Sequence, residues 1–164
     1  MCIRDRGSTI GFSLIGRLSD LDSAIDKSLK YGNHVLIEEY IDGKEITVSI
    51  LGDRVLPIVE IKPHSSVYDY ESKYTKGESD YVCPAEIDDS LSEEIKDIAL
   101  KIHKLLGCQV YSRVDFRLDK DNKFWLLEIN TLPGMTDTSL FPKAASAVHL
   151  NYNELIKNII RLAL

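Results

Sequence analysis

The spacing of apolar residues along the chain predicts four helices. Helical periodicity covers residues 21–31, 90–106, 139–148 and 152–164. The second segment gives the clearest signal, because its apolar residues form one stripe, namely Leu91, Ile95, Ile98, Ala99, Ile102, Leu105 and Leu106. Ser90 followed by Glu93 has the spacing of a capping box, which predicts that this helix begins at Ser90.

Other segments alternate between apolar and polar residues, as half-buried strands do. Residues 45–51 alternate and residues 55–61 return after a turn at Gly52, which predicts an antiparallel hairpin. Residues 110–118 and 124–130 predict a second hairpin, and 35–37 a shorter strand. This order predicts an α+β domain with helices on one face of an antiparallel sheet. Residues 62–82 follow neither period, which is typical of a functional or disordered loop.

Composition narrows the class of protein. The chain has 164 residues, 44% of them hydrophobic, which is enough for the core of about one domain. Its 20 basic and 26 acidic residues give a net charge of −6, so we expect no nucleic-acid partner. No apolar run is long enough to span a bilayer, and we expect no membrane partner. Cys2, Cys83 and Cys108 lack metal-ligand spacing and indicate buried or free thiols in a reducing, cytoplasmic compartment.

Candidate chemistry concentrates in the second predicted hairpin. Alternation places Arg113, Asp115 and Arg117 on one face of its first strand. On its second strand Glu128 and Asn130 share a face, opposite one formed by Trp125, Leu127 and Ile129. A turn near Asp121 brings Asp115 roughly across from Glu128. Two carboxylates and an amide oxygen are donors that Mg²⁺ accepts. The alternative is a solvated face on which the carboxylates lie beside the two arginines.

The segment after this hairpin adds groups that bind anions. Pro133 and Gly134 form a loop that offers free backbone N–H groups beside the candidate metal site. Ser139 begins a predicted helix, whose first-turn amides can hold an anion.

Residues 128–136 have the sequence Glu-Ile-Asn-Thr-Leu-Pro-Gly-Met-Thr, which resembles the signature of D-alanine–D-alanine ligases of the ATP-grasp superfamily. Five other segments resemble motifs of this family in the same order: 7–11 (small-residue loop), 36–41 (adenine-binding hinge), 43–48, 68–74 (omega loop) and 113–115 (Arg-x-Asp). The resemblance covers essentially residues 7–164. It implies the C-terminal ATP-grasp domain, a mainly antiparallel sheet with flanking helices, and part of the small central subdomain.

The resemblance also implies a reaction and its catalytic groups. ATP phosphorylates the carboxylate of one D-alanine, and the amine of a second attacks the acyl phosphate, giving D-alanyl-D-alanine for peptidoglycan precursors. Asp115, Glu128 and Asn130 would hold two Mg²⁺ ions, with Mn²⁺ as a possible substitute. Arg113 and the N–H of Gly134 would stabilise the oxyanion of the tetrahedral intermediate.

Further roles follow from the same resemblance. Backbone groups of Glu39 and Ile41 and the Glu38 carboxylate would bind adenine, Glu45 the ribose hydroxyls, and Lys73 the phosphates. Ser139 and Leu140 would bind the carboxylate of the second D-alanine, and Ser8 would shape the first-substrate site. Tyr74 would favour an amine as second substrate, and Tyr68 would help to close the omega loop. For Ser8, Tyr68 and Lys73 the alternatives are a Gly-Ser turn, a packed loop aromatic and an ordinary loop lysine.

The family enzyme is about twice as long as this chain, and lysines that precede residue 7 in the family have no counterpart here. We therefore expect residues 1–6 to be a non-native leader, 7–61 a partial central subdomain and 62–164 the C-terminal domain. The parent enzyme would be a homodimer acting on small molecules, ATP and D-alanine. Three alternatives stay open: a non-catalytic ATP/Mg²⁺-binding module, a D-alanine–D-lactate ligase and a D-alanine–D-serine ligase.

Overall fold

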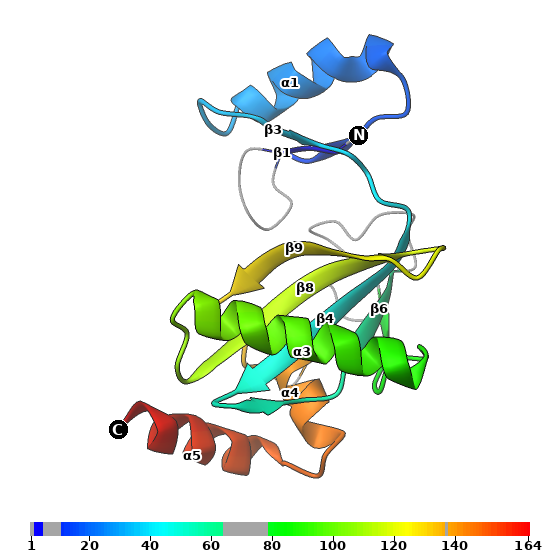
Figure 1. Ribbon diagram of the computed structural model, residues 1–164. Helices are drawn as coiled ribbons and strands as arrows, with labels where there is room; N and C mark the ends of the chain where they lie inside the picture. Colours follow the sequence, from blue (N-terminus) through cyan, green and yellow to red (C-terminus); the bar gives the residue numbers. More distant parts are fainter. Residues whose placement is uncertain (1, 5–10, 64–78, 137) are drawn as a thin grey trace. The chain divides into compact units, whose positions relative to one another are not determined.

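Two compact units make up the protein, for which the computed structural model describes residues 2–4, 11–63, 79–136 and 138–164. The first unit comprises Met1–Ile41 and Pro63–Ser79, and the second comprises Asp42–Lys62 and Asp80–Leu164 (Figure 1). This division differs from the expected boundary between residues 61 and 62. Residues 42–62 join the second unit because they supply a central strand of its sheet.

The first unit is a small sheet with one helix. Its three antiparallel strands have the order β2-β1-β3 and comprise β1 (Cys2–Arg4), β2 (Ser13–Leu14) and β3 (Leu36–Glu38). A 3₁₀ helix, η1 (Leu18–Asp20), leads into α1 (Leu21–Leu29), in which Ala24 and Ser28 are buried. Residues 2–4 therefore form the central strand, and the expectation that residues 1–6 are a non-native leader stays a prediction.

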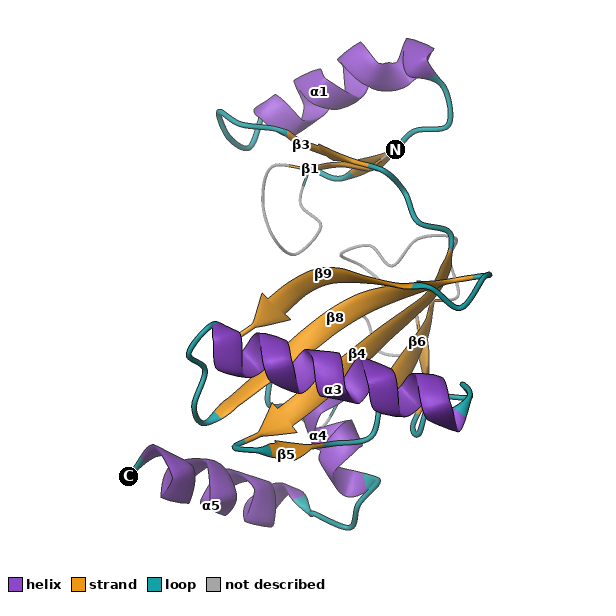
Figure 2. Cartoon of the chain, viewed as in Figure 1, coloured by secondary structure: helices purple, strands orange, loops and turns teal. Residues whose placement is uncertain are grey.

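The second unit is built on an antiparallel sheet in the order β7-β6-β4-β8-β9 (Figure 2). These strands are β4 (Gly43–Leu51), β6 (Val59–Pro63), β7 (Ser79–Val82), β8 (Tyr111–Asp119) and β9 (Phe124–Asn130). The predicted return strand over 55–61 is split into β6 and a short β5 (Arg54–Val55), both paired with β4. Both predicted hairpins are thus present, and β4 pairs with β8 along its whole length.

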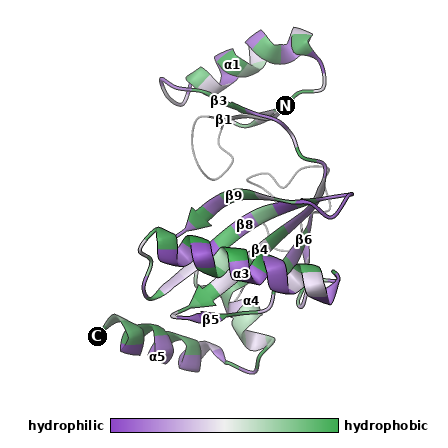
Figure 3. Ribbon diagram, viewed as in Figure 1, coloured by the Kyte–Doolittle hydropathy of each residue, from purple (hydrophilic) through white to green (hydrophobic). Residues whose placement is uncertain are grey.

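The core lies between one face of this sheet and α3 (Asp89–Leu105). Figure 3 shows α3 carrying both apolar and polar residues around its circumference, as expected of a helix with one side on a sheet. The fully or almost fully buried core residues are Ile46, Val48, Ile50, Ile58, Ile95, Ala99, Val114, Phe116 and Leu118. Alternation along β4 and β8 therefore produces one continuous apolar face, as the sequence predicts.

The start of α3 differs from the prediction. Its N-cap is Asp88, whose carboxylate accepts hydrogen bonds from the backbone N–H groups of Ser90 and Leu91. Ser90 lies inside the helix, and Glu93 pairs with Lys96 instead of closing a capping box. The expected Ser90–Glu93 capping box is wrong, because the helix begins earlier, at Asp89, and Asp88 satisfies the first-turn amides of Ser90 and Leu91. A capping box does occur at α5 (Tyr152–Ala163), between Asn151 and Glu154.

The opposite face of the sheet also carries a helix. Phe141 of α4 (Leu140–Ser146) packs edge-on against Tyr111, with ring centroids 5.9 Å apart. Tyr111 points away from α3, because it alternates with Ser112, whose hydroxyl lies 2.7 Å from His103 of α3. The expectation of helices on one face only is therefore wrong, while the broader one of a sheet with flanking helices is confirmed.

An irregularity in the β8–β9 hairpin changes which residues share a face. Asp115 pairs with Glu128 but Phe116 pairs with Leu126, so Leu127 is an extra residue, a β-bulge. Trp125 pairs with Arg117 and lies on the same face as Glu128. The expectation that Trp125, Leu127 and Ile129 share one face is wrong, because the bulge shifts the alternation by one residue.

Two local features fix the ends of these strands. Asp119 accepts hydrogen bonds from the N–H groups of Asp121 and Lys123, both at 2.9 Å, and from the Trp125 indole at 3.0 Å. These donors, the indole above all, hold the pKa of Asp119 below its usual range. Gly43 lies against Leu118 with a φ of +149°, and a Cβ there would collide with the Leu118 carbonyl oxygen.

None of the helices in the described part of the chain is both long and apolar enough to cross a membrane.

Candidate active site

The face of the sheet opposite α3 carries polar residues on three adjacent strands, and we call it the polar face. Cross-strand neighbours on one face of a sheet lie close together, so the register defines rows of side chains. The central row is Thr47, Asp115 and Glu128 on β4, β8 and β9. The rows on either side are Ser49, Arg113 and Asn130, and Glu45, Arg117 and Trp125. The predicted placement of Asp115 across from Glu128 is confirmed.

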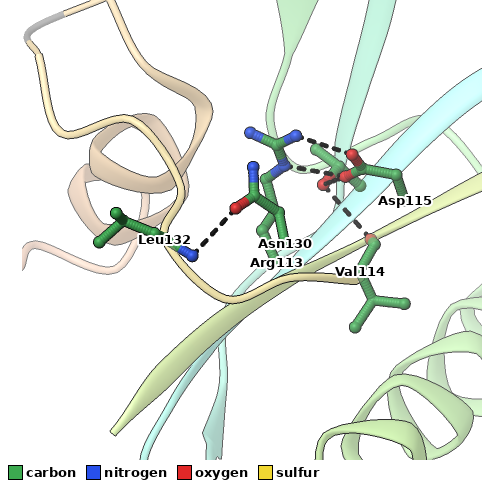
Figure 4. A network of polar contacts seen from close by, with 6 residues as sticks. Arg113, Val114, Asp115, Asn130 and Leu132 are labelled. Carbon is green, nitrogen blue, oxygen red and sulfur yellow. Dashed lines mark hydrogen bonds and ion pairs between the residues drawn. The ribbon is translucent and has the colours of Figure 1, made fainter. Parts of the chain in front are cut away.

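Asp115 and Arg113 form the strongest polar contact of this face. The guanidinium donates through Nε to Oδ1 at 2.8 Å and through Nη2 to Oδ2 at 2.7 Å (Figure 4). The two side chains are only 17% and 13% exposed, so solvent screens the pair weakly. The alternative interpretation of the hairpin was a solvated face on which the carboxylates lie beside the arginines. Asp115 does pair with an arginine, but this pair is largely shielded from solvent. The geometry is bidentate, which gives both strength and a fixed orientation.

Asp115 has a third partner on the neighbouring strand. The hydroxyl of Thr47, which is fully buried, donates to Asp115 Oδ1 and approaches the carbonyl oxygen of Val114 at 3.3 Å. Asp115 therefore accepts hydrogen bonds from two different strands. Sequence reasoning missed Thr47, although its position on the predicted strand 45–51 would have pointed to it once β4 was known to pair with β8.

Asn130 connects the hairpin to the loop that follows. Its Oδ1 accepts a hydrogen bond from the N–H of Leu132 at 3.0 Å (Figure 4). This local bond turns the chain directly after β9 and fixes the side-chain amide at the end of the strand. A carbonyl oxygen has two lone pairs, so Oδ1 keeps one site for a further partner.

The donors on this face match the chemistry of a hard divalent cation. Asp115, Glu128 and Asn130 supply two carboxylates and one amide oxygen, and Glu128 is exposed. Within the described residues no group of three or more His, Cys, Asp and Glu side chains could hold a metal, so the third side chain of this candidate donor set is an amide and not another carboxylate. The Arg113 guanidinium supplies positive charge to Asp115 in this structure, and a cation would have to share or replace that contact. The residues therefore fit Mg²⁺, provided that Arg113 yields at least one oxygen.

The loop between β9 and α4 is held by contacts of its own. Ser139 is the N-cap residue of α4, but its hydroxyl bonds to Thr136, at 3.0 Å from the backbone nitrogen and 2.8 Å from Oγ1. A Cβ at Gly134 would lie 3.0 Å from Ser139 Oγ, so glycine permits this close approach. The Tyr152 hydroxyl donates to the carbonyl oxygen of Met135 at 2.8 Å. Thr136 and Tyr152 were not predicted, and no sequence signal marks Tyr152.

The expected substrate-carboxylate residues are at the start of α4. Leu140 is buried, with 8% of its surface exposed, and Ser139 is half-buried. The Ser139 hydroxyl would have to exchange its Thr136 contacts to bind a ligand. The assignment of Ser139 and Leu140 to the carboxylate of a second substrate stays a prediction.

The expected nucleotide residues are divided between the two units. Glu45, on the polar face, approaches Arg117 with Oε2 3.6 Å from Nη1, and both side chains are largely buried. Glu38, Glu39 and Ile41 belong to the first unit, where β3 ends at Glu38. Their adenine-binding roles stay predictions. The residues Ser8, Tyr68, Lys73 and Tyr74 lie outside the described part of the chain.

Solved structures with the same fold define the class. One is a D-alanine–D-alanine ligase from Bacillus anthracis complexed with ATP, with a TM-score of 0.81, 34% identity, and coverage of 98% of this chain and 52% of that one. Another is the VanG D-Ala:D-Ser ligase from Enterococcus faecalis, with a TM-score of 0.84, 30% identity, and coverage of 99% and 49%. The fold is that of the C-terminal domain of an ATP-grasp ligase.

The family follows from the sequence match. The family model described as "D-ala D-ala ligase C-terminus" matches residues 4–161. The D-alanine–D-alanine ligase of Methylacidiphilum infernorum is 47% identical over 158 residues, covering 96% of this chain and 52% of that protein. That of Halalkalibacterium halodurans is 43% identical over 163 residues, covering 96% and 53%. The chain belongs to the D-alanine–D-alanine ligase family, and it spans about half the length of the curated relatives it matches.

Proposed function

We propose that this chain supplies the Mg²⁺-binding face and the catalytic arginine of an ATP-dependent D-alanine–D-alanine ligase. The observation that carries the proposal is the central row of the polar face, in which Asp115 and Glu128 lie opposite each other beside Arg113. Two carboxylates in direct register repel each other unless a cation neutralises them. Family membership supports the same proposal.

Each residue of this site has a chemical task in the proposed reaction. Asp115, Glu128 and Asn130 would hold Mg²⁺, which neutralises charge on phosphate oxygens when it is bound. Arg113 would leave Asp115 and stabilise the oxyanion formed when the amine of one D-alanine attacks the activated carboxyl of the other. The Gly134 N–H would be a second donor to that oxyanion. The products are the dipeptide, ADP and inorganic phosphate.

Nucleotide recognition would use residues beyond the cation site. Glu45 would accept hydrogen bonds from the ribose hydroxyls, and Glu38 would accept one from the adenine amine, with backbone groups of Glu39 and Ile41 on the adenine edge. Lys73 would contact the phosphates. The ATP complex of the Bacillus anthracis enzyme supports a nucleotide as ligand of this fold. A homodimeric, cytoplasmic parent enzyme is part of the same proposal.

A titration of the chain with ATP and Mg²⁺, followed by calorimetry, tests the site. We expect binding that requires Mg²⁺ and is lost in Asp115→Asn and in Glu128→Gln. The matched control is Asp121→Asn, an exposed carboxylate in the turn of the same hairpin, which should leave binding unchanged. Binding that persists in both site variants would overturn the proposal.

A second candidate is a non-catalytic ATP/Mg²⁺-binding module, which the same donor set of Asp115, Glu128 and Asn130 would serve. Release of inorganic phosphate in the presence of D-alanine separates the two. Turnover by this chain alone supports the enzyme, while Mg²⁺-dependent ATP binding without turnover supports the module. The choice of second substrate needs product analysis with D-alanine, D-serine and D-lactate, because the D-Ala:D-Ser ligase shares the fold. We propose D-alanine, and Tyr74 is the position to change.

A further inference from the structure

Thr47 occupies an unusual position for a polar residue without an assigned role. It has no exposed surface and lies on β4, directly opposite Asp115 in the register of β4 and β8. Its side chain has one hydroxyl hydrogen, and the nearer of its two acceptors is Asp115 Oδ1. A hydrogen bond to a charged carboxylate is stronger than one to a neutral carbonyl, so Asp115 is the dominant partner.

The contacts that Arg113 and Thr47 make with Asp115 differ in whether they have to break when a cation binds. Arg113 occupies both carboxylate oxygens, and a cation can bind Asp115 only when the guanidinium yields at least one of them. The Thr47 hydroxyl occupies one side of Oδ1 only, and it is attached to a strand paired with both β6 and β8. Thr47 can therefore keep its contact while Arg113 moves.

We propose that Thr47 is the positioning residue of the cation site, and this inference rests on the proposed function of Asp115. Its buried hydroxyl holds the Asp115 carboxylate in one orientation through Oδ1, which leaves Oδ2 available to a cation when Arg113 releases it. Without this bond the carboxylate is free to rotate, and part of the binding free energy is spent on ordering it. Residues that orient ligands in this way typically contribute about 10–100-fold to metal affinity.

The chain contains a matched control for Thr47. Ser49 lies on the same strand and the same face two residues further on, and it is also fully buried. Among the described residues its hydroxyl has no hydrogen-bond partner. Ser49→Ala therefore removes a buried hydroxyl from the same face without removing a bond to Asp115.

Binding of Mn²⁺ to the whole chain, followed by electron paramagnetic resonance, tests the role directly. Thr47→Val keeps the shape of the side chain and removes the donor, and we expect it to weaken Mn²⁺ binding by about 10-fold or more. Thr47→Ser keeps the donor and should restore most of the affinity. Ser49→Ala should bind as the unchanged chain does. Equal Mn²⁺ affinity in Thr47→Val and the unchanged chain would overturn the inference, and so would an equal loss in Ser49→Ala.

Two further measurements keep the outcome clear. If Thr47→Val does not fold, Thr47→Cys takes its place, since a thiol is a weak donor, and the expected order of affinity is Thr, then Ser, then Cys. Asp115→Asn is measured alongside. If Asp115→Asn and Glu128→Gln bind Mn²⁺ as the unchanged chain does, the proposed function fails. If they lose binding while Thr47→Val keeps it, only the role of Thr47 fails.

Discussion

The two faces of the β4–β8 pair use the same strands for different purposes. On the α3 face the side chains of Ile46, Val48, Val114 and Phe116 have no exposed surface and belong to one cluster of apolar residues. On the polar face the alternate residues meet through directed hydrogen bonds and ion pairs. Apolar burial is non-directional and stabilises any well-packed arrangement, whereas a polar row has specific partners that a ligand can replace.

This difference implies that substitutions on one face should affect mainly stability, and substitutions on the other mainly ligand binding. Substitutions on the α3 face should lower the free energy of unfolding. Substitutions on the polar face should change binding more than stability, because its polar contacts are ones that a ligand can replace. Four changes, from the largest expected effect to the smallest, test that separation.

Phe116→Ala should cause the largest loss of stability. The ring is fully buried and packs edge-on against Phe124 at 5.9 Å. Removing such a ring from a core costs about 3–5 kcal/mol, which urea unfolding followed by circular dichroism would measure. Leu126→Ala is the control, because Leu126 pairs with Phe116 on the same face but is 51% exposed. Similar losses for both variants would show that this face is not a distinct core.

Deletion of Ile129 should weaken the cation site while leaving much of the sheet intact. Without this paired residue, Asn130 would take the position opposite Val114 and turn toward the α3 face. We expect clearly weaker Mn²⁺ binding by electron paramagnetic resonance. The control is deletion of Leu127, the unpaired bulge residue, which leaves Glu128 opposite Asp115 and Asn130 opposite Arg113 and should keep binding. Unchanged Mn²⁺ affinity after deletion of Ile129 would mean that Asn130 is not a ligand.

His103, on α3, should make the stability of the protein depend on pH. Its ring is 2% exposed and contacts Ser112 Oγ at 2.7 Å, and burial lowers its pKa despite the nearby Asp53 carboxylate. The unfolded chain therefore binds more protons than the folded one below the usual histidine pKa of about 6.5. Stability should be fully present above that value and decline as the pH falls through the folded pKa. Thermal unfolding from pH 7.5 to 5.5 should show this slope, reduced in His103→Gln and kept in the exposed His34→Gln.

Tyr152→Phe should have the smallest effect. It removes only the hydrogen bond to the Met135 carbonyl, at a side chain that is 43% exposed. The expected loss in urea unfolding is about 1 kcal/mol. Limited proteolysis should become faster between residues 131 and 139, which this contact holds against α5. A loss as large as that of Phe116→Ala would contradict the division between the two faces.

Periodicity predicted most of the fold because burial enforces it. The alternation in β4 and β8 defines the α3 face without reference to any other part of the chain. The predicted stripe on α3 matches it except at Leu105 and Leu106, which are exposed at the end of the helix. The residue that begins a helix was harder to predict than the helix itself. Asp88, and not Ser90, caps α3, because both residue types are good N-caps and the sequence does not decide between two helix starts so close together. The pairing of β4 with β8 was not predicted, since it joins strands about 70 residues apart.

The candidate site was predictable in part. Motif spacing pointed to Arg113, Asp115, Glu128 and Asn130, and the register brings all four together. The sequence did not indicate Thr47, Thr136 or Tyr152, because each acts through a partner distant in sequence or in a loop without periodicity. The bulge at Leu127 was also unpredicted, since nothing in a run of apolar residues marks which one is unpaired.

The sequence by itself determined which faces of β4 and β8 are buried, where the hairpins turn, and which family the motifs resemble. These properties are local, because they depend on the hydropathy and backbone preferences of neighbouring residues. Only the tertiary structure decided that β4 lies beside β8, that Thr47 meets Asp115, and that Arg113 occupies the carboxylate proposed to bind a cation. Strand order and register depend on long-range pairing, in which a shift of one residue exchanges the two faces of a strand.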